Sequence, residues 1–239
     1  MEAAFTTLTT APLAPLLERL YEEADAESPA TSPAVTELSV EERTRLMQSK
    51  TDYLALFARL KDFSLPVSRE TSRLLYMLAR TSGARAIVEF GTSFGISTLH
   101  LAAALRDNGG GRLITTEFEP SKVARARANL TIGGLIDLVE VREGDALKTL
   151  NVDLPETIDL LLLDGAKSIY TEVLRLVESR LRPGAFIVAD NIDNSPEYVA
   201  HVRSLENGYL SLPFRQDVEL SMRITRSAHN PNRITDRHS

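Results

Sequence analysis

From residue 85 onward, short apolar runs alternate with segments of helical periodicity, and this alternation restricts the fold more than any other feature. Helices are expected between the runs, at about 95–107, 120–131, 146–150 and 168–181. Strands and helices that alternate in this way favour a parallel, doubly wound α/β sheet with helices on both faces. The apolar runs typical of buried strands cover residues 86–90, 112–116, 138–141, 158–163 and 185–189.

The last two expected strands depart from this pattern. Residues 209–213 and 218–224 are separated only by residues 214–217. Such a short connection suits an antiparallel pair rather than a crossover. The sequence therefore predicts a seven-stranded sheet, with five parallel strands followed by an antiparallel C-terminal hairpin.

Extra helices are expected before the sheet. Residues 1–38 are predicted to form an extension and linker, with a short helix at about 15–24 and an acidic linker at 25–36. A longer helix is expected at about 40–63, with Ser39 and Glu42 in capping-box spacing at its start, and another at about 68–81. We expect residues 39–225 to form the main domain and residues 226–239 a flexible tail.

Composition narrows the function classes. The net charge of −6 lacks the basic footprint expected of a protein that binds a polyphosphate backbone. The absence of cysteine excludes disulfides, a thiolate zinc site and a cysteine nucleophile. No apolar run suits a signal peptide or approaches the roughly 20 residues of a membrane span. We therefore expect a cytoplasmic protein that binds neither nucleic acid nor membrane.

The segment VEFGTSFGIST ends the first expected strand and opens a helix. Gly91 and Gly95 allow a tight turn and close approach of a ligand, and the helix start offers free amides to an anionic group. The G-x-x-x-G spacing lacks the third glycine of the dinucleotide fingerprint, and no Gly-Lys-Ser/Thr follows as in a phosphate loop. The segment predicts a ligand loop, with a plain turn between strand and helix as the alternative.

The next two strand ends carry further candidates. Glu117 ends the second strand, 26 residues after Gly91, where a carboxylate can accept hydrogen bonds from both hydroxyls of a ribose. A solvated charge at the strand end is the alternative. Asp145 and Ala146 follow the third strand and are predicted to lie near a base, although Asp145 equally suits a helix N-cap. Together these residues favour a nucleoside ligand.

Polar side chains also follow the fourth and fifth strands. Asp164 and Asp190 are 26 residues apart, one strand–helix–strand crossover, which places them at the same end of nearby strands. With the amide oxygen of Asn191 they form a hard-oxygen set that suits Mg²⁺, with Mn²⁺ also possible. Singly, Asp164 suits a helix N-cap and the Asp190-Asn191 pair a turn. Their combination with Lys167, three residues after Asp164, favours a functional site.

The segments VEFGTSFGIST, TTEFEP, DGAKSIY and GAFIVADN resemble the catechol and caffeoyl-CoA O-methyltransferases, a class I group with small bacterial members. The resemblance covers roughly residues 68–225 and is sharpest in D-x-x-K-x-x-Y and the later D-N. It implies a Rossmann-like fold, S-adenosyl-L-methionine as cofactor, a divalent metal and methyl transfer to a hydroxyl of a small vicinal diphenol. Secondary metabolism and a homodimer are further expectations.

The resemblance also implies roles for individual residues. Asp164, Asp190 and Asn191 would hold the metal, and Lys167 would be the catalytic base, with Asp164 beside it. Glu117 would hold the ribose, with Asp145 and Ala146 near the adenine. The remaining cofactor-binding positions would be Val67, Glu89, Gly91, Thr92, Ser93, Gly95, Ser97 and Asp164.

The acceptor site is less constrained by the sequence. Gly165 and Ala166 stand where the mammalian catechol enzyme has larger side chains, and the chain has no Trp. Any aromatic gate must then be Phe or Tyr. The helices at 15–63 are expected to cap the active site or to form a dimer interface. The residues expected to shape the acceptor pocket are Met47, Tyr53, Phe214 and those near Asn194.

Three other functions stay open at this point. The first is a class I methyltransferase that works without a metal on another oxygen or nitrogen acceptor. The second is a nicotinamide oxidoreductase, which the glycine spacing opposes. The third is a nucleoside-binding module without catalytic activity, against which the complete set of Asp164, Lys167, Asp190 and Asn191 argues.

Overall fold

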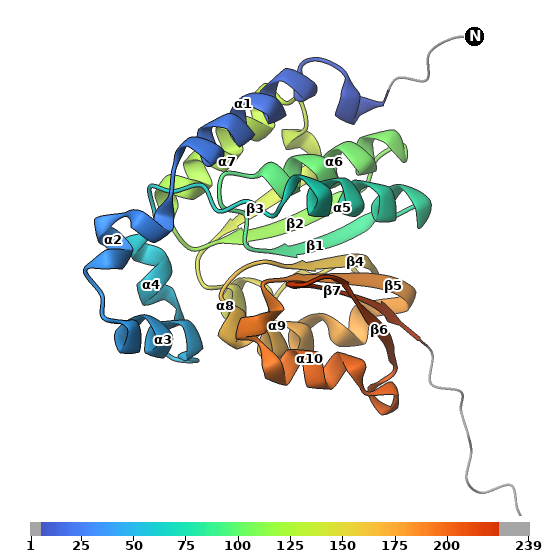
Figure 1. Cartoon of the computed structure of the whole chain (residues 1–239). Coiled ribbons are helices and arrows are strands. Elements are labelled where there is room, and N and C mark those ends of the chain that lie inside the picture. The colour runs from blue at the N-terminus through green and yellow to red at the C-terminus, as the bar shows by residue number, and fades with distance from the viewer. Residues whose placement is uncertain (1–5, 225–239) are drawn as a thin grey trace, which may run out of the picture.

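The computed structural model describes residues 6–224, and a seven-stranded sheet forms its centre (Figure 1). The strand order is β3-β2-β1-β4-β5-β7-β6. The first five strands pair in parallel, and β7 lies antiparallel between β5 and β6. The strands are β1 (Ala86–Phe90), β2 (Arg112–Glu117), β3 (Val139–Glu143), β4 (Ile158–Leu163), β5 (Leu181–Asp190), β6 (Tyr209–Arg215) and β7 (Val218–Arg223). The predicted doubly wound sheet with a C-terminal hairpin is confirmed.

Helices cover both faces of this sheet (Figure 1). One face carries α1 (Leu13–Ala26), α5 (Arg69–Thr81), α6 (Ile96–Asp107) and α7 (Pro120–Ile132). The other carries α8 (Ala146–Thr149), α9 (Tyr170–Val177) and α10 (Pro196–Arg203). A separate group at one end of the sheet consists of α2 (Pro33–Thr36), α3 (Val40–Gln48) and α4 (Tyr53–Arg59). Short 3-10 helices are Thr7–Thr9, Pro29–Thr31, Ile136–Leu138, Lys167–Ile169, Glu178–Arg180, Ile192–Asn194 and Leu205–Asn207.

The N-terminal helical segments differ from expectation in one respect. The capping box of Ser39 and Glu42 is present, but the single helix expected at 40–63 is wrong, because α3 and α4 are separate helices. Between them, Ser49 Oγ accepts hydrogen bonds from the backbone amides of Thr51 (3.3 Å) and Asp52 (2.8 Å). A serine side chain that binds nearby amides in this way competes with the helical hydrogen-bond ladder.

The C-terminal half shows two further differences. The helix expected at 168–181 ends earlier, since α9 stops at Val177 and β5 already starts at Leu181. Helix α10 was not predicted, although Ser195-Pro196 provides a proline at its first position, a common start signal. The expected tail at 226–239 lies outside the described residues.

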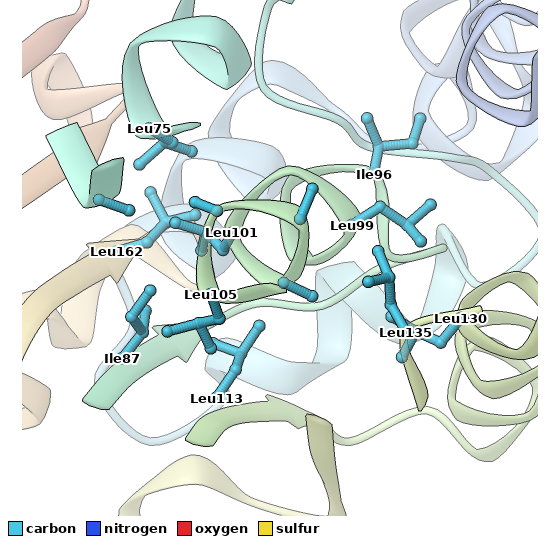
Figure 2. Packing of buried hydrophobic residues seen from close by; sticks show 14 of the residues in the cluster. Leu75, Ile87, Ile96, Leu99, Leu101, Leu105, Leu113, Leu130, Leu135 and Leu162 are labelled. Atoms are coloured by element: carbon cyan, nitrogen blue, oxygen red, sulfur yellow. The ribbon is translucent and has the colours of Figure 1, made fainter. Parts of the chain in front are cut away.

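The core consists of two apolar clusters, one on each face of the sheet. Helix α6 is buried on nearly all sides, because it packs between the sheet and α5 and also contacts α1 (Figure 2). Helix α1 adds Leu13, Leu16, Leu17 and Leu20 to the same cluster. The first helix thus packs on the sheet domain, while the division proposed at residue 38 stays a prediction. Within residues 6–224, no helix has the length and apolar character needed to cross a membrane.

Candidate functional site

Two adjoining cavities lie where the parallel strands end. The first is bordered by the segments after β1, β2, β3 and β4 and by α4. The second lies between α3 and α4 and the residues that follow β4 and β5. Phe57, Leu65 and Asp164 line both cavities, so Asp164 stands at their boundary. Helix α4 therefore caps the site, one of the two roles expected for the N-terminal helices.

The loop after β1 is held in a strained, close-fitting conformation. Gly91 has φ +104°, and a Cβ there would lie 2.6 Å from the carbonyl oxygen of Asp164. Only glycine lets the loops after β1 and β4 approach this closely. Ser93, at φ +48°, accepts a hydrogen bond on Oγ from the Leu65 amide (3.1 Å). The Ser93 amide in turn donates to Glu117 Oε2 (2.9 Å), which ties the loop to the end of β2.

Glu89 lies beneath this loop rather than in the cavity. Its carboxyl group is fully buried and accepts hydrogen bonds from the hydroxyls of Ser97 (2.5 Å) and Thr98 (2.6 Å). Burial raises the pKa of Glu89 to about 7, and the two hydroxyls only partly offset this effect. Thr92 is also buried, with Oγ1 2.6 Å from Thr115 Oγ1. These residues shape the loop from below.

Glu117 reaches the first cavity with its carboxylate already fixed in place. Its Oε1 accepts a hydrogen bond from the amide of Glu119 (3.1 Å), and its side chain is largely buried. Burial raises its pKa above the usual value, while the nearby positive charge of Lys122 acts in the opposite direction. A carboxylate held in this way at the end of β2 can accept hydrogen bonds from a polar ligand in the cavity.

Lys122 is a cavity residue that the sequence analysis missed. It belongs to α7, is only 4% exposed and lines the first cavity. Burial lowers its pKa. Its Nζ lies 5.9 Å from the centre of the Phe94 ring. In the sequence, Lys122 could be recognised only by its place in the first turn of the helix after Glu117. Many solvent-exposed lysines occupy such a position, so it did not indicate a cavity residue.

Asp145 has the helix-capping role that was its alternative in the sequence. Its Oδ1 accepts hydrogen bonds from the Leu147 amide (3.0 Å) and from the hydroxyl of Tyr53 (2.7 Å). The second contact links α4 to the start of α8. Ala146 and Tyr53 both line the first cavity, whereas Asp145 does not.

The structure brings together the four polar residues that follow β4 and β5. Asp164, Lys167, Asp190 and Asn191 all line the second cavity. Lys167 Nζ donates hydrogen bonds to Oδ1 (2.7 Å) and the carbonyl oxygen (3.2 Å) of Asp164. Burial raises the pKa of Asp164, and burial together with the negative charge of Asp164 raises the pKa of Asp190 to about 7.

These residues fit a hard divalent cation. The negative charge of Asp164 raises the pKa of Asp190, so a cation placed beside both carboxylates would stabilise their ionised forms. Asn191 offers an amide oxygen, and its φ of +51° is a left-handed conformation that asparagine tolerates. Among residues 6–224, no three His, Cys, Asp or Glu side chains form a metal-binding cluster. A cation here would therefore rely on amide and added ligand oxygens as well.

Close packing against Phe90 explains why residue 165 is a glycine. A Cβ at this position would overlap the aromatic ring of Phe90. Phe90, Gly165 and Ala166 all line the first cavity, so the small residues leave room for the Phe90 ring in its wall.

Comparison with known proteins gives this arrangement its context. Residues 88–192 match the model of a methyltransferase domain family. The chain is 37% identical over 132 residues to a catechol O-methyltransferase of Niastella koreensis, covering 54% of this chain and 59% of that protein. It is 35% identical over 128 residues to one of Mycobacterium tuberculosis, covering 54% and 57%. The chain therefore spans less than two thirds of the length of these relatives.

A solved structure agrees with the fold. The O-methyltransferase of Bacillus cereus in complex with SAH superposes with a TM-score of 0.63 at 24% sequence identity, covering 73% of this chain and 90% of that one. The chain is thus similar to class I O-methyltransferases in fold and to catechol O-methyltransferases over about half of its sequence. The first cavity lies at the loop after β1, where open α/β sheets bind their ligands.

The cofactor-binding positions that the sequence resemblance implied fall into two sets, inside and outside the lining of the first cavity. Gly91, Ser93, Glu117, Ala146 and Asp164 line the first cavity. The residues outside its lining are Val67, Glu89, Thr92, Gly95, Ser97 and Asp145.

The residues expected to shape the acceptor pocket do not all line the same cavity. Met47 and Asn194 line the second cavity and Tyr53 the first. Phe214 lines neither, because it lies on β6 at the edge of the sheet and is 39% exposed. Arg43 lines the second cavity and had not been singled out from the sequence.

Proposed function

We propose that this protein transfers a methyl group from S-adenosyl-L-methionine to a hydroxyl of a small vicinal diphenol, with the help of a divalent metal ion. The observation that carries the proposal is the position of Asp164. It borders both cavities and accepts a 2.7 Å hydrogen bond from Lys167 Nζ. A methyl donor in one cavity and an acceptor in the other would meet at this side chain.

The first cavity suits the donor. Glu117 would accept hydrogen bonds from the ribose hydroxyls, and Ala146 would lie beside the adenine. The loop at Gly91 and Ser93 would surround the methionine part, with Glu89 as a buried support below it. Bound S-adenosyl-L-methionine supplies an electrophilic methyl group on a sulfonium, which an acceptor oxygen takes as the carbon–sulfur bond breaks.

The second cavity suits the acceptor. Asp164, Asp190 and Asn191 would hold Mg²⁺ or a similar ion, which favours the ionised form of a bound hydroxyl. Phenols have pKa values near 10, as tyrosine does, so this hydroxyl otherwise stays protonated at neutral pH. Lys167 Nζ, once unprotonated, accepts the hydroxyl proton as the new oxygen–carbon bond forms. Phe57 and Leu65 provide an apolar wall between the two cavities.

Three finer features belong to the same proposal. A homodimer is supported by the apolar side chains of Leu210, Leu212 and Phe214, which are exposed on the edge strand β6. A cytoplasmic location is supported by the absence of cysteine, which suits a reducing compartment. A role in secondary metabolism rests on the family resemblance alone.

The test is methyl transfer by the purified full chain from labelled S-adenosyl-L-methionine. Vicinal diphenols are compared with matched monophenols, with Mg²⁺ and after chelation. We expect label in the diphenols only, and more of it with Mg²⁺. Equal labelling after complete chelation would rule out the metal mechanism, and no labelling of any phenol would rule out the O-methyl transfer itself.

A further inference from the structure

Arg43 stands out in the second cavity because its side chain has no partner among residues 6–224. It lies on α3 and lines the cavity together with Asp164, Lys167 and Asp190. Its Nε is completely buried and has no hydrogen-bond partner. No ion pair or hydrogen bond joins its side chain to any other residue in the described range 6–224. A buried donor on a charged group is costly to leave unpaired, so a ligand group is the natural partner.

The carboxylates of the same cavity do not fill this role. Asp164 is already paired with Lys167 Nζ at 2.7 Å. The charges that act on Asp190 are those of Asp164, Lys167, Asp217 and Arg215. The positive charge of Arg43 is therefore available to a molecule that enters the cavity.

The remaining walls indicate the shape of such a molecule. Apart from Arg43 and the polar residues after β4 and β5, the lining is apolar, which suits an aromatic ring. A ring with hydroxyls near Asp164 and Asp190 would thus have a second polar group near Arg43. The apolar lining residues are Val35, Met47, Leu56, Phe57, Leu60, Leu65 and Pro66.

We propose that Arg43 binds a carboxylate on the acceptor. The substrate class is then a vicinal diphenol with an acid group on its ring or on a short side chain, in preference to neutral or cationic diphenols. The planar guanidinium matches a carboxylate with two parallel hydrogen bonds, which an ammonium group does not reproduce. This inference rests on the proposed O-methyl transfer and specifies its acceptor.

The experiment compares 3,4-dihydroxybenzoate with its methyl ester, which keeps both hydroxyls but removes the charge. In the unsubstituted chain we expect a kcat/KM about 10- to 100-fold higher for the acid, the range for hydrogen bonds to a charged group. Arg43→Gln removes this preference, mainly through a higher KM for the acid, so that acid and ester then have similar kcat/KM values. Arg43→Lys restores part of it.

A control on the same helix is Arg45→Gln. Arg45 is 62% exposed and pairs with Asp52 at the surface, so its removal leaves the preference intact. Calorimetry with S-adenosylhomocysteine present gives a second readout without turnover, with weaker binding of the acid to Arg43→Gln. Equal kcat/KM for acid and ester in the unsubstituted chain overturns the inference while leaving the methyl transfer standing. Methylation of neither compound, nor of any other diphenol, overturns the proposed function itself.

Discussion

Lys167 Nζ lies 2.7 Å from Oδ1 of Asp164, and this pair is buried where the two cavities meet. The side chains are only 11% and 8% exposed. Lys167 Nζ also lies 5.7 Å from the centre of the Tyr170 ring. These two contacts fix the position of the Lys167 side chain. The pair thus places the proposed proton acceptor at the boundary of the two cavities, and it leads to the first prediction.

Replacing Lys167 tests its role as the base. We expect Lys167→Ala to lower kcat by about 10²- to 10⁴-fold, the range for a positioned general base. Affinity for S-adenosylhomocysteine, measured by calorimetry, should change little because Lys167 does not line the first cavity. Lys148→Ala, at an exposed lysine on α8, is the control. An unchanged kcat in Lys167→Ala would remove the assignment as base.

Asp190 tests the metal site. Asp190→Ala should abolish the stimulation of turnover by Mg²⁺, because one of two buried carboxylates is lost. The matched control is Asp193→Ala, three residues away on the exposed side of the same segment. Turnover is measured in a titration with Mg²⁺ after chelation. A normal Mg²⁺ response in Asp190→Ala would show that this carboxylate holds no metal.

Glu117 tests the position of the donor. In Glu117→Gln the neutral amide accepts hydrogen bonds from ribose hydroxyls less strongly, and it also weakens the tie to the Ser93 amide. We expect affinity for S-adenosyl-L-methionine to fall about 10- to 150-fold, as hydrogen bonds to charged groups contribute about 1.5–3 kcal/mol. Calorimetry measures this directly. Glu143→Gln, at the exposed end of β3, should bind normally, and equal affinities of the two variants would refute the role of Glu117.

The raised pKa of Glu89 predicts that the free energy of unfolding depends on pH. Its pKa is raised from 4.5 to about 7 in the folded chain, so the folded state holds this proton more tightly than the unfolded state. The contribution to stability is complete below pH 4.5 and is lost as pH rises to about 7. At 1.36 kcal/mol per pKa unit, the loss is roughly 3 kcal/mol.

The measurement is the free energy of unfolding from denaturant titrations between pH 4.5 and 8, for the unsubstituted chain and for Glu89→Gln. His100 has an opposite dependence, because burial lowers its pKa to about 4 and its contribution is lost as pH falls. This dependence is present in both proteins and cancels in their difference. The unsubstituted chain should lose stability relative to Glu89→Gln as pH rises to 7. A difference that stays constant with pH would contradict the prediction.

The sheet could be predicted well because its signals are local. The apolar runs at 86–90 and 158–163 match β1 and β4 residue for residue. Each is bounded by polar or glycine residues and is fully covered on both faces, so periodicity and length suffice. The break between α3 and α4 was missed because it depends on one serine side chain that competes for backbone amides.

The candidate site was only partly predictable. Asp164, Lys167, Asp190 and Asn191 came together as expected, because parallel strands end at one edge of a sheet. Lys122 and Arg43 were missed, since both lie in ordinary polar positions of helical patterns. What makes them unusual is the burial of Lys122 in α7 and the packing of α3 against the residues after β4, to which sequence spacing gives no guide.

By itself, the sequence determined the order of the strands along the chain and which strand ends carry carboxylates, lysine and glycine. These depend on periodicity and on backbone chemistry, which act over a few residues. Only the tertiary structure decided that α4 closes over the strand ends and that Asp164 borders two cavities. It also decided that Arg43 lines the second cavity with no side-chain partner in the described part of the chain. These relationships arise when segments distant in sequence exclude water from a shared space, and burial then changes the pKa values of the groups inside.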